Sequence, residues 1–170
     1  MCIMNKKLFV RILSAFAVLL ISLFIFYMSS KTATDSNDIS GSFLNGILDF
    51  FIKGFDDLPF NERLTIIENY QLLVRKLAHF TIFAALGAFS LVFLSTFDKI
   101  KKPLSELFGW LYVVAFAVSD EIHQLFVLGR TGKLSDVLLD ALGGALGILI
   151  TSFIIKKILH FLEAKKNAEQ

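Results

Sequence analysis

Residues 137–158, "VLLDALGGALGILITSFIIKKI", decide the fold. The stretch is apolar over the length that a helix needs to cross the hydrocarbon core of a bilayer, about 20 residues. It nevertheless carries Asp140 near its start, and Gly143 and Gly147 form a G-x-x-x-G pattern that lets a second helix approach closely. Both glycines share one helical stripe with Asp136 and Asp140. We therefore expect this stripe to pack against other helices and to carry Asp140 inward.

Three further apolar stretches, residues 8–28, 78–97 and 104–126, predict helices of the same kind. The last of these is long enough to span only if its polar end, from Asp120 onward, lies at the membrane interface. The composition agrees, because 55% of the 170 residues are hydrophobic, with 19 Phe and only two Pro. We predict an all-α, integral membrane four-helix bundle, formed as a single domain over residues 1–170, whose fourth span covers residues 136–158.

Basic residues predict the orientation of this bundle. Lys and Arg cluster before the first span, between the second and third, and after the fourth. Cytoplasmic segments of membrane proteins carry an excess of these residues, so we place both termini, including a tail of residues 159–170, in the cytoplasm. The first span is interpreted as a signal anchor, because no small-x-small cleavage site follows it, with a cleaved signal peptide as the alternative.

Residues 29–77 then form a long extracytoplasmic loop. We expect a polar, mobile linker over residues 31–40 and a helix on the membrane surface over residues 41–58, where apolar residues recur at helical spacing. Asn61 is a candidate N-cap for a helix that leads without a break into the second span.

Charge and cysteine content exclude several classes. A net charge of +2 without a basic stripe argues against nucleic acid as a partner. The single cysteine, Cys2, excludes an internal disulfide and a cysteine metal cluster.

Polar side chains are concentrated in residues 119–140, "SDEIHQLFVLGRTGKLSDVLLD". Charges in the middle of a bilayer cost about 2.5–3.5 kcal/mol each, so they usually face one another or a water-filled cavity. In the predicted topology this segment lies at the same outer end as Arg75, Lys76 and His79, and Ser135 is a natural N-cap for the fourth span. We predict one outward-facing binding pocket, whose candidate residues are Lys76, His79, Asp120, Glu121, His123, Gln124, Arg130, Asp136 and Asp140.

Each candidate also has a structural interpretation when taken alone. Asp136 suits the first turn of a helix, His79 suits a hydrogen-bonded interior position, and Arg130 suits an anchor for lipid phosphate. Three helix ends that supply complementary charge to one place favour a functional pocket over an ion-pair network alone.

These motifs resemble the VanZ-like family of bacterial membrane proteins, which is associated with resistance to the glycopeptide teicoplanin. The resemblance covers residues 75–150 and begins with "RKLAHF" at residues 75–80. The matching residues are Lys76, His79, Glu121, Gln124, Gly129, Arg130, Asp136, Asp140, Gly143 and Gly147. The chain departs from the family at Leu128, where a proline is frequent, and at Ile82 and Phe83, where an acidic and an aromatic residue are frequent. The resemblance implies a multi-pass protein of the cell membrane that acts at the bacterial envelope, and it implies no particular reaction.

Three functions stay open. In a binding or resistance module, the pocket would bind a membrane lipid, a lipid-linked wall precursor or a glycopeptide, with Arg130 contacting phosphate or carboxylate in two places. In an enzyme, the carboxylates and His123 would hold a divalent metal for phosphoryl or acyl chemistry on a lipid headgroup or isoprenoid carrier; otherwise we expect no cofactor. A transporter would require a homo-oligomer, for which Gly143 and Gly147 offer a helix contact.

Overall fold

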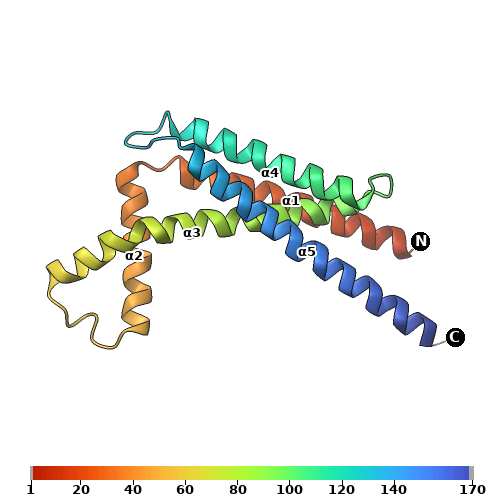
Figure 1. Ribbon diagram of the computed structural model, residues 1–170, viewed down its shortest axis with the longest axis horizontal. Coiled ribbons are helices and arrows are strands. Elements are labelled where there is room, and N and C mark those ends of the chain that lie inside the picture. Colours follow the sequence, from red (N-terminus) through yellow and green to blue (C-terminus); the bar gives the residue numbers. More distant parts are fainter. Residues whose placement is uncertain (1, 169–170) are drawn as a thin grey trace.

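The computed structural model describes residues 2–168, which fold entirely into helices and their connections (Figure 1). Five helices and no strands are found among these residues, which confirms the all-α prediction. The helices are α1 (Cys2–Ser29), α2 (Ala33–Phe51), α3 (Phe60–Ser95), α4 (Lys102–Gln124) and α5 (Leu134–Ala168).

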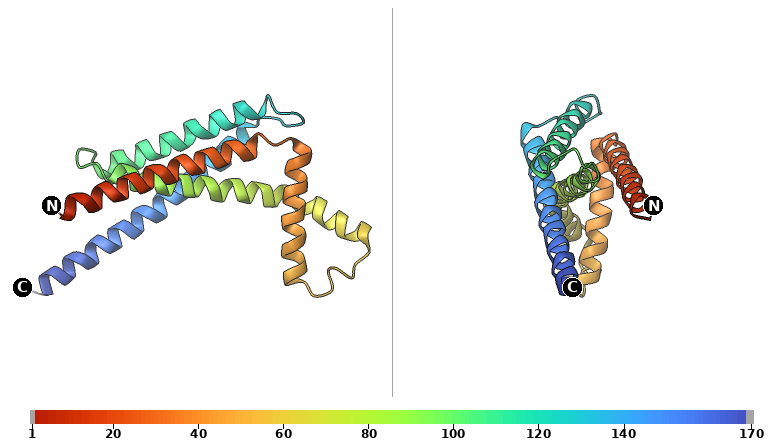
Figure 2. Two further views of the ribbon diagram at one scale, coloured as in Figure 1. Left: turned by 180° about the vertical axis from the view of Figure 1, so that it is seen from behind. Right: turned by 90° about the vertical axis from the view of Figure 1, so that its right-hand side faces the viewer.

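Helix α3 is the centre of the fold and contacts each of the other four helices. Helices α1 and α4 run along it, α5 crosses it obliquely, and α2 stands across it near its N-terminal part (Figures 1 and 2). The second half of α5 extends away from the others, so the four long helices do not form a closed parallel bundle. Both termini lie at the end of the molecule that carries the α3–α4 connection.

Within residues 2–168, three helices are long and apolar enough to cross a membrane: α1 over Lys6–Ser29, α3 over its whole length, and α5 over Leu134–Asn167. Helix α4 is not among them, because Glu106, Asp120 and Glu121 interrupt its apolar residues. The four-span count and the cytoplasmic location of the termini therefore stay predictions.

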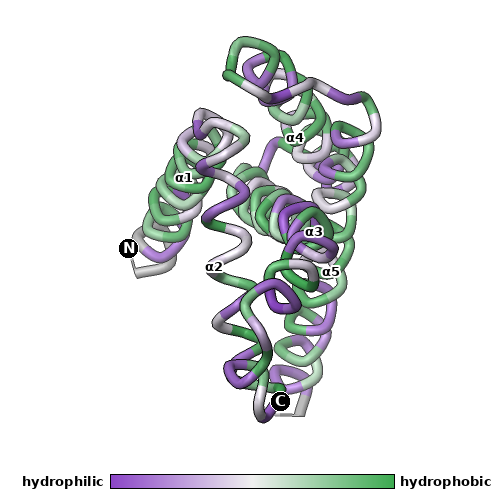
Figure 3. Tube along the Cα trace, turned by 90° about the vertical axis from the view of Figure 1, so that its left-hand side faces the viewer, coloured by the Kyte–Doolittle hydropathy of each residue, from purple (hydrophilic) through white to green (hydrophobic). Residues whose placement is uncertain are grey.

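The segment expected to be a mobile linker is instead the first half of α2. Thr32 caps this helix by accepting a hydrogen bond from the backbone nitrogen of Asp35 at 3.2 Å, and the Asp35 carboxylate lies in the first turn, where it suits the helix dipole. Capping chemistry thus outweighs the polar composition, which is visible along α2 in Figure 3. Helix α3 begins after Pro59 rather than at a cap formed by Asn61, and it continues unbroken into the span, as predicted.

Helix α5 is longer than expected at both ends. It begins at Leu134, so Ser135 lies within its first turn and is not the N-cap. It also continues through most of the predicted tail, as far as Ala168.

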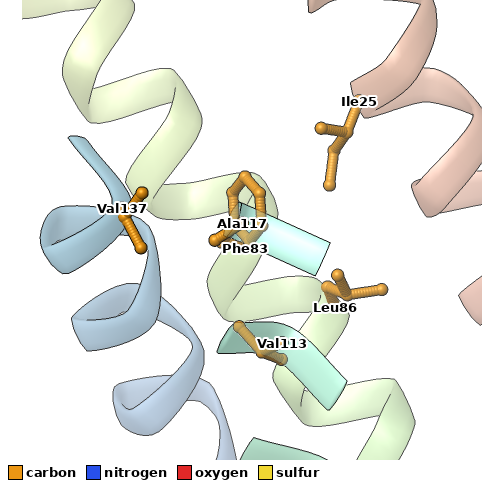
Figure 4. Close-up of a cluster of buried hydrophobic side chains, with 6 residues drawn as sticks. All are labelled: Ile25, Phe83, Leu86, Val113, Ala117 and Val137. Carbon is orange, nitrogen blue, oxygen red and sulfur yellow. The ribbon is translucent and has the colours of Figure 1, made fainter. Parts of the chain in front are cut away.

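The apolar core is small. Six buried side chains from four helices meet at its centre: Ile25, Phe83, Leu86, Val113, Ala117 and Val137 (Figure 4). Around this core, large apolar side chains point outward, for example Phe9 at 67% exposed and Leu149 at 66% exposed. A contiguous apolar surface of this kind is what lipid chains cover in a membrane protein.

The start of α1 is held to the α3–α4 connection. Arg11 donates to the hydroxyl of Thr96 at 3.0 Å and to its carbonyl at 2.8 Å, and it lies over the ring of Phe97. Beside it, Lys7 pairs with Asp98. The fold thereby gathers at one end the basic segments that we assigned to one side of the membrane.

Candidate functional site

A glycine seam (Gly87, Gly143, Gly144 and Gly147) sets the position of α5 on α3. A methyl group at Gly143 would overlap the carbonyl oxygen of Phe80, and one at Gly147 would overlap that of Ala84. From one contact to the next, the chain advances by four residues in both helices, so the two helices run in the same direction here. The expected inward stripe of α5 therefore packs against α3 of the same chain, and the same register brings the start of α5 beside Lys76 and His79.

At the polar end of this seam lies a cavity of about 170 Å³, which we call the polar pocket. Its walls come from α3, α4, α5 and the α4–α5 loop, with Ala33 of α2 at one edge. The charged or amide-bearing side chains that line it are Arg75, Lys76, His79, Glu121, Gln124, Arg130, Lys133, Asp136 and Asp140.

Two acid–base pairs join α3 to α5 across the polar pocket. The ammonium of Lys76 donates to Asp136 Oδ1 at 2.7 Å, and both side chains are partly exposed. One turn deeper, His79 Nδ1 lies 3.8 Å from Asp140 Oδ2, which is beyond hydrogen-bond distance. The Asp140 side chain is only 2% exposed, yet neither of its oxygens has a hydrogen-bond partner. A buried carboxylate without hydrogen-bond partners is costly.

Glu121 connects α4 to the start of α5. Its Oε2 accepts a hydrogen bond from the backbone nitrogen of Lys133 at 2.7 Å, one residue before the helix begins. Backbone nitrogens at a helix start lack partners within the helix and favour a negative group, which explains this choice. The loop is tight at this point, because a methyl group at Gly132 would lie 2.7 Å from the carbonyl oxygen of Glu121.

Arg130 ties the α4–α5 loop to the end of α1. Its guanidinium donates to the carbonyl oxygens of Lys31 at 3.0 Å and Met28 at 3.3 Å, and to Gln124 Oε1 at 3.3 Å. The last carbonyl oxygens of a helix lack donors within the helix, so a cation placed near them is favourable. Burial and then the charge of Arg75 lower the pKa of Arg130. Most of the fork is thus occupied by protein acceptors, which leaves less of it for the phosphate contact that the sequence suggested.

Two predicted pocket residues lie behind the polar pocket rather than in its wall. Asp120 Oδ2 accepts hydrogen bonds from Ser29 at 2.8 Å and from Gln124 at 3.0 Å, next to α1. His123 Nε2 is 3.1 Å from the Ser30 hydroxyl, and its ring stacks on Phe26. Both side chains therefore bind α4 to α1, and the other seven candidates line the cavity.

Sequence reasoning missed some of the lining. No sequence motif distinguishes Lys133 from other loop lysines. Ala33 belongs to α2, whose first half the polar composition led us to expect as a linker. Ser29, which is fully buried and bonded to Asp120, gave no signal because it lies almost a hundred residues away in the chain.

Metal binding has no support from the grouping of ligands. Within residues 2–168, no set of three or more His, Cys, Asp and Glu side chains has the placement to hold an ion. Metal-assisted chemistry stays an untested alternative.

Comparison with known proteins decides the family. The VanZ/LLP1 family model matches residues 14–161, which is most of the chain. The protein belongs to the VanZ/LLP1 family. The resemblance noted over residues 75–150 is thereby confirmed, and the match extends to α1 and α2. No curated protein and no solved structure matches the chain.

Proposed function

We propose that this VanZ-family membrane protein binds, at the outer face of the cell membrane, the polar part of a lipid, a lipid-linked wall precursor or a lipoglycopeptide, and that this binding contributes to teicoplanin tolerance. The observation that carries the proposal is Asp140, a buried carboxylate that lines a cavity and has two unpartnered oxygens. Groups of both signs surround it, which suits a ligand with both anionic and donor atoms.

Susceptibility to teicoplanin and vancomycin tests this function in a host without the gene. Asp140→Asn and Glu121→Gln keep the shape of the pocket and remove one charge each. Glu163→Gln and Asp57→Asn are matched controls, because both residues are exposed and lie outside the polar pocket. We expect wild type and both controls to raise teicoplanin tolerance selectively, and the pocket variants to fail at equal membrane levels on a blot. Equal tolerance in all five strains would exclude the pocket from the phenotype.

An enzyme is the second candidate, favoured by the approach of His79 to Asp140. A carboxylate beside an imidazole orients the ring and stabilises its protonated form, as general acid–base catalysis requires. Radiolabelled membrane lipids incubated with purified protein separate the two functions. A new product that disappears with His79→Gln would identify an enzyme, whereas saturable binding without conversion supports the binding module.

A further inference from the structure

A second cavity of about 270 Å³ adjoins the polar pocket, and we call it the apolar groove. It lies between α1, α2 and α3, and its apolar walls include Phe24, Met28, Ile39, Phe43, Ala78 and Ile82. Arg75, His79 and Arg130 line both cavities. The two cavities are therefore neighbouring parts of one site, with an apolar part and a charged part.

The groove leads from the charged end toward the middle of the spans. Arg75 and His79 stand at its mouth, and Ile82 lies about 10 Å beyond Arg75 along α3 at 1.5 Å per residue. On α1, which ends beside the polar pocket, Phe24 is likewise deeper than Met28. This geometry matches a molecule whose polar group stays at the surface while its chain enters the hydrocarbon layer.

The charges of the polar pocket restrict the headgroup. Asp140 needs a hydrogen-bond donor, whereas the Lys133 ammonium has no hydrogen-bond or ion-pair partner among the described residues and suits an anion. Lys76 is already neutralised by Asp136.

We infer that the site binds one glycerophospholipid with a primary-amine headgroup, such as phosphatidylethanolamine. Its phosphate lies at Lys133 and Arg75, its ammonium donates to Asp140, and one acyl chain occupies the apolar groove. This inference rests on the proposed function and narrows its ligand from any envelope amphiphile to one class of membrane lipid.

The test uses full-length protein in phosphatidylcholine vesicles that contain a trace of phospholipid with a photoreactive acyl chain. The probe headgroup is ethanolamine, choline or absent, as in diacylglycerol. Choline carries the same charge as ethanolamine but has no N–H donor for Asp140. We expect the ethanolamine probe to cross-link to the groove about tenfold more than the other two, as one hydrogen bond to a charged group predicts.

Two filling variants check the place of the chain. Ala78→Phe fills the groove from α3, and Ala115→Phe places the same side chain at an exposed site on α4 that lines neither cavity. Ile39→Trp fills the groove from α2, with Ile122→Trp as its control on α4. We expect both filling variants to abolish groove cross-linking and both controls to retain it. The second pair decides the matter if Ala78→Phe fails to fold.

Headgroup binding is measured separately, as protection of Lys133 by water-soluble glycerophosphoethanolamine from an amine-reactive reagent kept in excess over the ligand's own amine; Lys53, exposed and outside both cavities, is the reference lysine. Protection without cross-linking in the groove would overturn the inference and leave the proposed function standing. Equal cross-linking by all three probes would overturn it as well, because the groove would then be an unselective apolar surface. Protection by a lipid-linked wall precursor, but not by the ethanolamine compounds, would identify a different ligand for the same pocket. Absence of protection by any of these compounds would overturn the inference and the proposed function together.

Discussion

The glycine seam and the polar pocket lie on the same pair of helices, yet they are built in opposite ways. In the seam, backbones touch without intervening side chains, and each of Gly143, Gly144 and Gly147 has a neighbour in the place of a side chain. In the pocket, one turn from Gly143, the buried carboxylate of Asp140 has no hydrogen-bond partner. The close packing at the seam sets the distance between α3 and α5. At this distance the polar pocket between the two helices contains the Asp140 carboxylate without a hydrogen-bond partner.

The largest effect is expected in the seam, from Gly147→Ala. The new methyl group would overlap the backbone carbonyl oxygen of Ala84, and the backbone shift needed to relieve this overlap costs free energy. We expect the free energy of unfolding to fall by about 3 kcal/mol or more. Gly46→Ala is the control, since nothing lies within 4 Å of a methyl group there and alanine favours a helix by about 0.5–1 kcal/mol. Unfolding in mixed micelles measures both, and similar stability of the two variants would refute close packing at the seam.

The next effect contrasts Asp120 with Asp140. Asp120→Ala removes the acceptor for Ser29 and Gln124 and should lower the free energy of unfolding by about 1–3 kcal/mol. Asp140→Asn removes a buried charge that accepts no hydrogen bond and has only the 3.8 Å approach of His79, so we expect stability to stay the same or to rise while ligand binding is lost. Thermal melts of both variants check this. A strong destabilisation by Asp140→Asn would mean that Asp140 is structural.

Arg130→Lys tests whether Arg130 stabilises the fold or binds a ligand. A lysine cannot reproduce the fork that reaches Met28, Lys31 and Gln124 together, so we expect a loss of about 1–2 kcal/mol. Faster hydrogen exchange at the end of α1 would accompany this loss. Unchanged exchange there, with ligand affinity reduced, would assign Arg130 to the ligand instead.

A smaller effect is expected for the pair of Lys76 and Asp136. Both side chains are partly exposed, so a double-mutant cycle with Lys76→Met and Asp136→Asn should give a coupling of about 0.2–1 kcal/mol. A larger coupling energy would show that Lys76 and Asp136 are less hydrated than their exposed fractions indicate.

The smallest effect lies at the far end, where Lys7 pairs with Asp98. The hydrogen bond and charge of Lys7 lower the pKa of Asp98. The pair therefore stabilises the fold at neutral pH, and this contribution is lost as the pH falls through the lowered pKa of Asp98. Asp98→Asn should abolish that part of the pH dependence in melting curves from pH 7 to pH 3. An unchanged pH profile would place the acid sensitivity elsewhere.

Local signals account for the predictions that hold. A long apolar run predicts a helix because its backbone must be satisfied within the segment, and α3 and α5 follow this rule. Polar residues at three helix ends predicted a common binding pocket; Lys76, His79 and Asp140 line one cavity, and ligand binding there stays a prediction. The prediction of a linker over residues 31–40 was wrong. The hydrogen bond that caps α2 joins Thr32 to Asp35, and the polar composition of the segment does not reveal it.

By itself, the sequence of this protein determined its four long helices, the close approach at Gly143 and Gly147, and the end of those helices at which acidic and basic side chains meet. These properties follow from the period and length of the apolar pattern, which act within one helix. Only the tertiary structure decided that His123 turns to α1, that Arg130 is held by carbonyls of α1, and that an apolar groove adjoins the pocket. Each of these depends on side chains roughly a hundred residues apart in the chain or on walls from three helices, and such distances arise only when the helices pack.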